Sequence, residues 1–148
     1  MAALPSSRLD PPARQALLDT AATAIEAGLG LIIAEPPAAT AVAGVLGERR
    51  ASFVTLTCAG ELRGCCGAIE PTWPLAIEVW HSAQASAFRD PRFAPLRVDE
   101  WGSVGLEISV LTPCEPLWVG SEVELLREIV PGRDGLVLAW GGQRVTFL

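Results

Sequence analysis

The stretch Leu62–Gly67 (LRGCCG) places a charged residue, two adjacent thiols and two glycines between apolar runs near the middle of the chain. Glycine inside a strand-like run usually marks a bulge or a close approach of another backbone. An arginine beside a cysteine favours the thiolate form of that cysteine. We therefore expect any chemical centre of this protein to lie at this stretch.

A predicted hairpin contains this stretch. Ser52–Thr57 alternates β-branched, aromatic and aliphatic residues and predicts a strand, and Ala59–Glu61 is typical of a hairpin turn. Leu62–Ile69 then returns antiparallel to the first strand. Because side chains alternate along a strand, the two adjacent cysteines point in opposite directions, and a disulfide between them would be strained. One predicted face carries Leu62, Gly64, Cys66 and Ala68, and the other carries Arg63, Cys65, Gly67 and Ile69.

Further helices and strands complete the predicted fold. The expected helices begin after the N-cap Asp10, at Thr72–Pro74 and at the capping box Ser121–Glu124. The expected later strands are Val104–Leu111, Leu136–Trp140 and Gln143–Phe147, the last two joined by a two-glycine turn. We expect one α+β domain over residues 1–148, with mainly antiparallel strands and flanking helices.

The composition narrows the classes of function. The net charge is −6, which is not the electrostatic footprint of a nucleic-acid binder, so we disfavour that function. The chain has no lysine, which excludes a Schiff-base lysine and a P-loop lysine. Its single histidine excludes a multi-histidine metal site, and the four cysteines form no CxxC pair. We therefore expect no metal site.

The apolar segments predict neither a signal peptide nor a membrane span. Met1–Arg14 lacks a basic segment followed by an apolar core. The apolar region Leu29–Leu46 is interrupted by Glu35 and two prolines. We expect a cytoplasmic protein whose cysteines are reduced.

Two further features have both structural and functional interpretations. His81 lies on the predicted Pro74–Phe88 helix beside polar residues, and we favour a solvent-facing or rim histidine over a catalytic one. Asp90 and Arg92 lie in the proline-rich loop after this helix. They either hold the loop together or form polar parts of a cleft, and the sequence leaves both interpretations open.

Four segments in this order resemble the AMMECR family, which includes the AmmeMemoRadiSam system protein A. They are LRGCCG, AFRDPRFAPL, LEISVL and DGLVL, and the similarity runs from about Arg8 to the end of the chain. The family hallmark is LRGC followed by an apolar residue and glycine. The resemblance implies an α+β protein with two lobes and a cleft near the hallmark, and it implies no settled activity.

The chain departs from the family pattern in three places. Cys66 stands where the family usually has isoleucine, so we expect it to be a buried small hydrophobe. Ala68 stands where the family usually has threonine, which questions any role for a hydroxyl there. Family members usually continue beyond the segment matching Val145–Leu148, so we expect the C-terminal part of the family pattern to be absent.

The family name implies partners and assigns the cofactors to them. It reflects association with a Memo-like protein and a radical-SAM protein. The resemblance therefore implies that any iron–sulfur cluster or S-adenosylmethionine belongs to the radical-SAM partner. We expect no cofactor in this chain.

One hypothesis for function is a thiol-dependent enzyme, or a component of one, with Cys65 as nucleophile or redox thiol. Arg63 is predicted on the same strand face as Cys65. An unpaired arginine in a glycine-broken strand is costly to bury, which favours an accessible cleft at this place. Against this hypothesis, no general base has a diagnostic spacing; the candidates are Glu70, Glu78, His81, Asp90 and Glu107.

The alternative is a non-catalytic binding or adaptor module for a small anionic ligand or a partner protein. Arg63 and Arg92 would hold the anion, since arginine matches carboxylates and phosphates. Gly64 and Gly67 would let the ligand approach the backbone. The sequence does not separate these hypotheses. Both predict a cleft that contains Arg63, Gly64, Cys65, Gly67, Asp90 and Arg92.

Overall fold

The computed structural model describes residues 9–147 of the chain. The chain divides into two compact units, one ending at Thr112 and the other beginning at Pro113. The predicted α+β class with antiparallel strands is confirmed.

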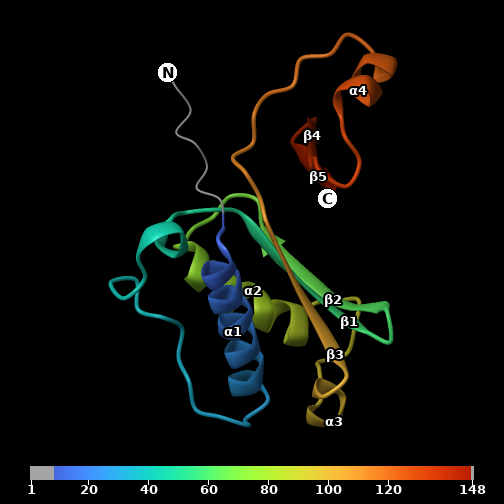
Figure 1. Cartoon of the computed structure of the whole chain (residues 1–148). Coiled ribbons are helices and arrows are strands. Elements are labelled where there is room, and N and C mark those ends of the chain that lie inside the picture. Colours follow the sequence, from blue (N-terminus) through green and yellow to red (C-terminus); the bar gives the residue numbers. More distant parts are fainter. Residues whose placement is uncertain (1–8, 148) are drawn as a thin grey trace. The chain divides into compact units, whose positions relative to one another are not determined.

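The first unit contains a three-stranded antiparallel sheet (Figure 1). Its strands are β1 (Ser52–Cys58), β2 (Glu61–Ala68) and β3 (Val104–Val110), in the order β2-β1-β3. The central strand β1 pairs with both neighbours over its full length. β2, which carries the LRGCCG stretch, is therefore an edge strand of this sheet.

Two helices pack against each other, and α2 covers one face of β1 and β2. Helix α1 (Pro11–Gly28) begins as predicted, because the N-cap Asp10 accepts a hydrogen bond from the backbone N–H of Ala13 at 2.9 Å. Helix α2 spans Leu75–Phe88, with Pro74 as its N-cap.

Two short elements were not predicted: a 3₁₀ helix η1 (Gly44–Gly47) and the helix α3 (Val98–Trp101). Both are too short to produce a helical periodicity.

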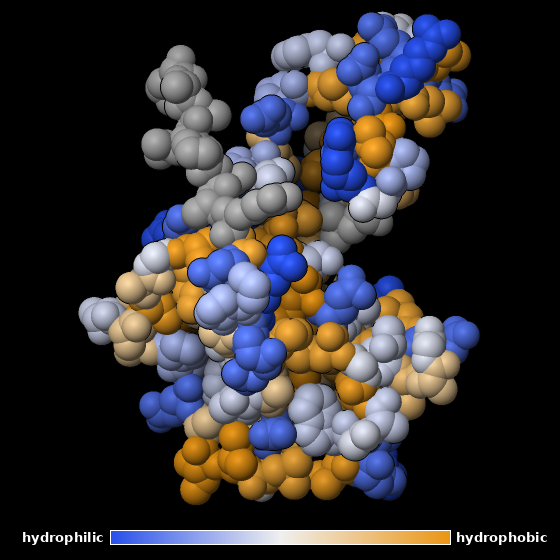
Figure 2. All heavy atoms as spheres, viewed as in Figure 1, coloured by the Kyte–Doolittle hydropathy of each residue, from blue (hydrophilic) through white to orange (hydrophobic). Residues whose placement is uncertain are grey.

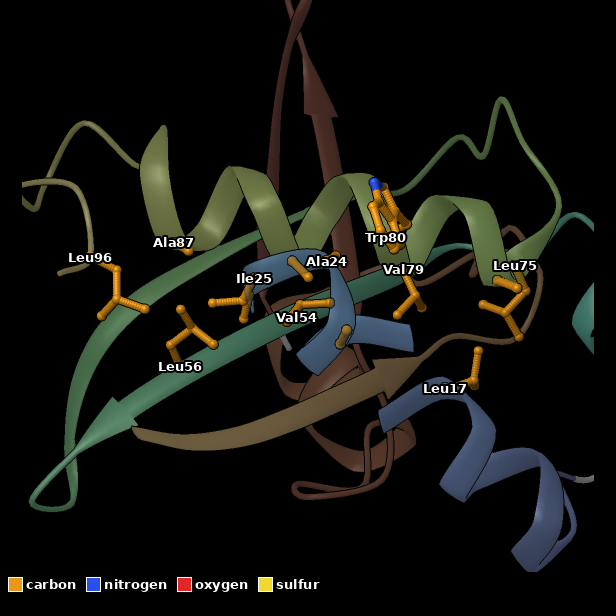
Figure 3. Packing of buried hydrophobic residues seen from close by; sticks show 13 residues of the cluster. Leu17, Ala24, Ile25, Val54, Leu56, Leu75, Val79, Trp80, Ala87 and Leu96 are labelled. Carbon is orange, nitrogen blue, oxygen red and sulfur yellow. The ribbon is translucent and has the colours of Figure 1, made fainter. Parts of the chain in front are cut away.

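The core lies between these helices and the inner face of the sheet (Figure 3). Val54 and Leu56 of β1 and Val79 of α2 are fully buried. On α1, Ile25 is fully buried and Leu17 is 2% exposed. Burying each such side chain stabilises the fold by roughly 1.5–3 kcal/mol. Alternate residues of β1 are only partly buried, so the opposite face of the sheet is the more open one.

The β1–β2 hairpin contains a tight turn and a bulge. Ala59 and Gly60 have φ values of 51° and 84°, as a two-residue hairpin turn requires. Leu56 pairs with Gly64 and Thr57 pairs with Leu62, so Arg63 is an extra residue without a partner on β1. The uninterrupted alternation predicted for Leu62–Ile69 is therefore wrong at this bulge.

The second unit is small and contains one helix and one hairpin. Helix α4 (Glu122–Glu128) is capped by Ser121, whose hydroxyl accepts a hydrogen bond from the Glu124 N–H. Strands β4 (Leu136–Trp140) and β5 (Gln143–Phe147) pair antiparallel around the predicted glycine turn. None of the described residues from Pro113 onward is buried. Figure 2 shows apolar side chains among polar ones on the visible surface of this unit.

Across residues 9–147, no helix combines the length and the apolar character that crossing a membrane requires.

Candidate functional site

The close contact between β2 and α2 explains the first glycine of the hallmark. A Cβ atom on Gly64 would lie 2.2 Å from the backbone oxygen of Ser86. The Ser86 hydroxyl accepts a hydrogen bond from the Cys66 N–H at 2.8 Å and lies 2.7 Å from the carbonyl oxygen of Val54. Since Val54 and Cys66 are paired residues, a side chain of α2 bridges the two strands at this point.

Cys66 lies on the sheet face that packs against α2, and it is partly buried rather than fully enclosed. Burial raises the pKa of the Cys66 thiol, and the negative charge of Asp90 raises it further. Both effects keep this thiol protonated and unreactive. The prediction that Cys66 serves as a core residue is therefore met in part.

Cys65 lies on the opposite, open face of the sheet. Its cross-strand partner is Thr55, whose hydroxyl donates a hydrogen bond to the Cys65 Sγ at 3.4 Å. The four cysteines are all free, and Cys65 is partly buried, as Cys66 is. The two adjacent thiols therefore have separate environments.

Asp90 and Arg92 hold the backbone of Cys65 from outside the sheet. The Asp90 Oδ2 atom accepts a hydrogen bond from the Cys65 N–H at 2.9 Å, and Arg92 Nη2 donates to the Cys65 carbonyl oxygen at 3.3 Å. An edge strand has unpaired backbone groups on its outer side. At Cys65 this loop supplies both missing partners.

Asp90 and Arg92 also form an ion pair with two hydrogen bonds, at 3.0 and 2.7 Å. Asp90 is buried, whereas 54% of the Arg92 side chain is exposed. Hydrogen bonds from Arg92 hold the pKa of the Asp90 carboxyl far below its usual range. The structural interpretation of this loop is therefore confirmed, and its role in a cleft stays a prediction.

Arg63 is paired, so the expectation of an unpaired arginine is wrong. Its Nε and Nη2 atoms donate to the Glu100 carboxylate at 2.9 and 3.1 Å. Only 15% of the Arg63 side chain is exposed, and the bulge accommodates it at the edge of the sheet. Glu100 lies on the short helix α3, and sequence reasoning missed it because no motif links α3 to β2.

Phe93 connects the two arginines. The guanidinium carbons of Arg63 and Arg92 lie 6.0 and 5.5 Å from the centre of its ring. Contacts of this kind are favourable because the ring face is electron-rich. The structure therefore brings together four predicted site residues, Arg63, Cys65, Asp90 and Arg92, around Phe93 and the outer edge of β2.

Gly67 has a packing role in this structure. A Cβ atom there would lie 2.2 Å from the Ser52 carbonyl oxygen and 2.6 Å from the Phe53 Cγ atom. The Phe53 side chain therefore lies against Gly67 on the open face of the sheet. Whether Gly64 or Gly67 also contacts a ligand stays a prediction.

The open face of the sheet carries a row of three functional groups. Thr55 of β1 pairs with Cys65 on one side and with Glu107 of β3 on the other. Directly paired residues point to the same face, so the thiol, the hydroxyl and the carboxylate form one cross-strand row. Sequence spacing could not show this, because the three residues lie on three different strands.

Two other features lie outside this group. His81 is partly exposed and packs near Trp73, with 6.2 Å between the ring centres.

An open concavity of about 740 Å³ contains none of the predicted site residues. Its lining residues are Gly28, Leu29, Phe88, Pro95, Leu96, Arg97, Val98 and Asp99. Within residues 9–147, no group of three or more His, Cys, Asp or Glu is arranged to hold a metal ion.

Comparison with known proteins finds relatives in archaea. Protein MJ0810 of Methanocaldococcus jannaschii is 41% identical over 106 residues, which are 70% of this chain and 53% of that protein. A protein of Thermofilum pendens is 47% identical over 88 residues, 60% of this chain and 41% of that protein. This chain spans about half the length of the curated relatives it matches.

A solved structure and a family model also match. The crystal structure of the uncharacterized protein PH0010 from Pyrococcus horikoshii has a TM-score of 0.79 and 36% sequence identity. The match covers 89% of this chain and 66% of that chain. The AMMECR1 family model matches residues 18–148, which include most of the first compact unit and all of the second. The predicted resemblance is therefore confirmed, and the chain belongs to the AMMECR1 family.

Proposed function

We propose that Cys65 supplies a reactive thiol to an enzyme, or to an enzyme complex of which this protein is a component. The observation that carries this proposal is the hydrogen bond from the Thr55 hydroxyl to the Cys65 Sγ on the open face of the sheet. The Thr55 hydroxyl contacts the sulfur directly and helps to hold it in place on this face. Because Asp90 and Arg92 fix the backbone on both sides of Cys65, the thiol is held in a defined position.

The charges around the site favour thiol chemistry over anion binding. Arg63 forms an ion pair with Glu100 through two hydrogen bonds, and Arg92 forms a similar pair with Asp90. An incoming anion would have to compete with these carboxylates. Among residues 9–147, in contrast, the Cys65 thiol has one hydrogen-bond partner, the Thr55 hydroxyl, and this bond to sulfur is weak.

The wider context of the proposal comes from the family resemblance. We propose that the protein acts in the cytoplasm, where thiols stay reduced, together with Memo-like and radical-SAM partners. Any iron–sulfur cluster or S-adenosylmethionine would belong to the radical-SAM partner. This chain would contribute the thiol.

The proposal is tested by alkylation with iodoacetamide. Two matched variants, Cys66→Ala and Cys65→Ala, each leave one thiol in the hallmark peptide. We expect the peptide with Cys65 to react at least about tenfold faster than the peptide with Cys66, because burial protects the latter. Rates are measured by peptide mass spectrometry at several pH values.

Reaction of Cys65 no faster than that of free cysteine at the same pH would sink the thiol proposal. A second candidate, a site for a small anion, would then be preferred, because more than half of the Arg92 side chain is exposed. Cellular function that survives Cys65→Ser would point the same way.

A further inference from the structure

The row of Cys65, Thr55 and Glu107 has a defined spacing. The register places the three residues side by side on adjacent strands. Neighbouring strands lie about 4.8 Å apart, so the backbone positions of Cys65 and Glu107 are about 10 Å apart. The Thr55 hydroxyl lies between them.

The Glu107 carboxylate differs from Asp90 and Glu100, the two acids that bond to residues of the hallmark. Asp90 and Glu100 are each matched by an arginine. Glu107 is exposed and takes part in none of the ion pairs or side-chain hydrogen bonds found among residues 9–147. The negative charge in the row is therefore available to a ligand.

The neighbouring row provides an apolar boundary. Phe53 pairs with Gly67 on one side and Ser109 on the other, and its ring lies against Gly67. A ligand that spans from Cys65 to Glu107 would cross the small Thr55 side chain beside this ring. The face thus offers a nucleophile, an apolar wall and a carboxylate on backbone positions that the strand register fixes.

We propose that this face binds a cationic substrate, with its ammonium or guanidinium group on Glu107 and its electrophilic centre at Cys65. Charge-assisted hydrogen bonds between such a cation and a carboxylate are strong and directional. In the reaction, the Cys65 thiol loses its proton to solvent water, its sulfur forms a bond to the electrophilic atom, and the leaving group departs with the electron pair of the broken bond. This inference rests on the proposed reactivity of Cys65.

Charged thiol reagents test the inference. The probes are trimethylammonioethyl methanethiosulfonate, which is cationic, and sulfonatoethyl methanethiosulfonate, which is anionic. With either probe, a disulfide forms on Cys65 and methanesulfinate leaves with the electron pair. The full chain is used with Cys58→Ser, Cys66→Ala and Cys114→Ser, so that Cys65 is the remaining thiol.

The measured quantity is the rate with the cationic probe divided by the rate with the anionic probe, at low ionic strength. We expect Glu107→Gln to lower this ratio about fivefold, which a single charge about 10 Å away can produce. Glu107→Asp should keep most of the ratio. Added salt should reduce the ratio of the parent protein, because the interaction is exposed.

Asp19→Asn is the matched control. It removes one exposed negative charge from α1, the helix layer behind the sheet, and should leave the ratio unchanged. An equal ratio in the parent and in Glu107→Gln, or a parent ratio that does not respond to salt, would overturn the inference. If neither probe modifies Cys65, the proposed function itself fails. The two failures are therefore distinguishable.

Discussion

At the scale of single residues, the Asp90 carboxylate joins the loop after α2 to the edge of the sheet. It accepts hydrogen bonds from the N–H groups of Cys65 and Arg92 and from the Arg92 guanidinium. The carboxylate is almost fully buried, so water cannot replace these partners. Asp90 therefore determines where the Cys65 thiol is presented.

Replacing Asp90 with asparagine tests this role. We expect Asp90→Asn to lower the free energy of unfolding by about 2 kcal/mol, since hydrogen bonds to a charged group are lost. Urea denaturation measures this change. Asp99→Asn is the control, because Asp99 pairs with Arg97 at the same spacing but both side chains are exposed. It should leave the stability almost unchanged, and an equal loss in both variants would contradict the role of Asp90.

The low pKa of Asp90 also predicts a pH dependence. A carboxyl whose pKa is lower in the folded state stabilises the fold above its unfolded pKa, which is about 3.9. This contribution is lost as the pH falls from that value toward the lower folded pKa. We expect the free energy of unfolding to fall less in Asp90→Asn than in the parent protein when the pH is lowered from about 5 to about 2. Urea denaturation at each pH measures this free energy. If the free energy of unfolding falls equally with pH in the two proteins, the low pKa of Asp90 does not contribute to the pH dependence.

At the scale of elements, the contact between α2 and β2 positions the hallmark. The helix approaches so closely at Ser86 that Gly64 has no room for a side chain. The Ser86 hydroxyl then bridges the two strands where their backbone groups face each other. The bulge at Arg63 lies immediately before Gly64 on the same strand, and the Arg63 side chain bonds to Glu100 there.

Gly64→Ala should therefore be strongly destabilising. The added methyl group would meet a backbone oxygen, which cannot move without shifting the helix from the sheet. We expect a loss of about 3 kcal/mol in the free energy of unfolding, measured by urea denaturation. Gly102→Ala is the control, since its φ is −63° and no atom lies within 4 Å of the new Cβ. If the two variants are equally stable, the close contact at Gly64 is not what requires glycine.

At the scale of the whole molecule, the two compact units differ in how much they bury. The first unit has a core of fully buried side chains between α1, α2 and the sheet. In the second, no described residue is buried, and Trp118 and Trp140 are 89% and 90% exposed. A two-stranded hairpin without a buried face is only marginally stable on its own.

This difference predicts unequal protection of backbone amides. Amides of the central strand β1 should exchange with solvent at least about a hundredfold more slowly than those of β4 and β5, because their opening requires loss of the core. Hydrogen–deuterium exchange followed by mass spectrometry measures both segments in one sample. Equal protection in β1 and in the β4–β5 hairpin would show that the second unit is stabilised by more than its own contacts.

The sequence by itself determined most of the elements of this protein. The N-cap at Asp10, the two hairpin turns and the alternation of β1 and β3 follow from local rules of backbone conformation and burial. The LRGCCG motif predicted the family, and its glycines predicted a bulge or a close backbone approach. The structure contains both, at Arg63 and Gly64.

Only the tertiary structure decided which side chains meet. Glu100 pairs with Arg63 across 37 positions of sequence, and Cys65, Thr55 and Glu107 align only through the register of three strands. Local patterns contain no information about such pairings, because packing of distant segments sets the register and the partner of each charge. The unpaired arginine expected from the sequence was wrong for this reason, and the open row beside Cys65 was invisible until the strands were paired.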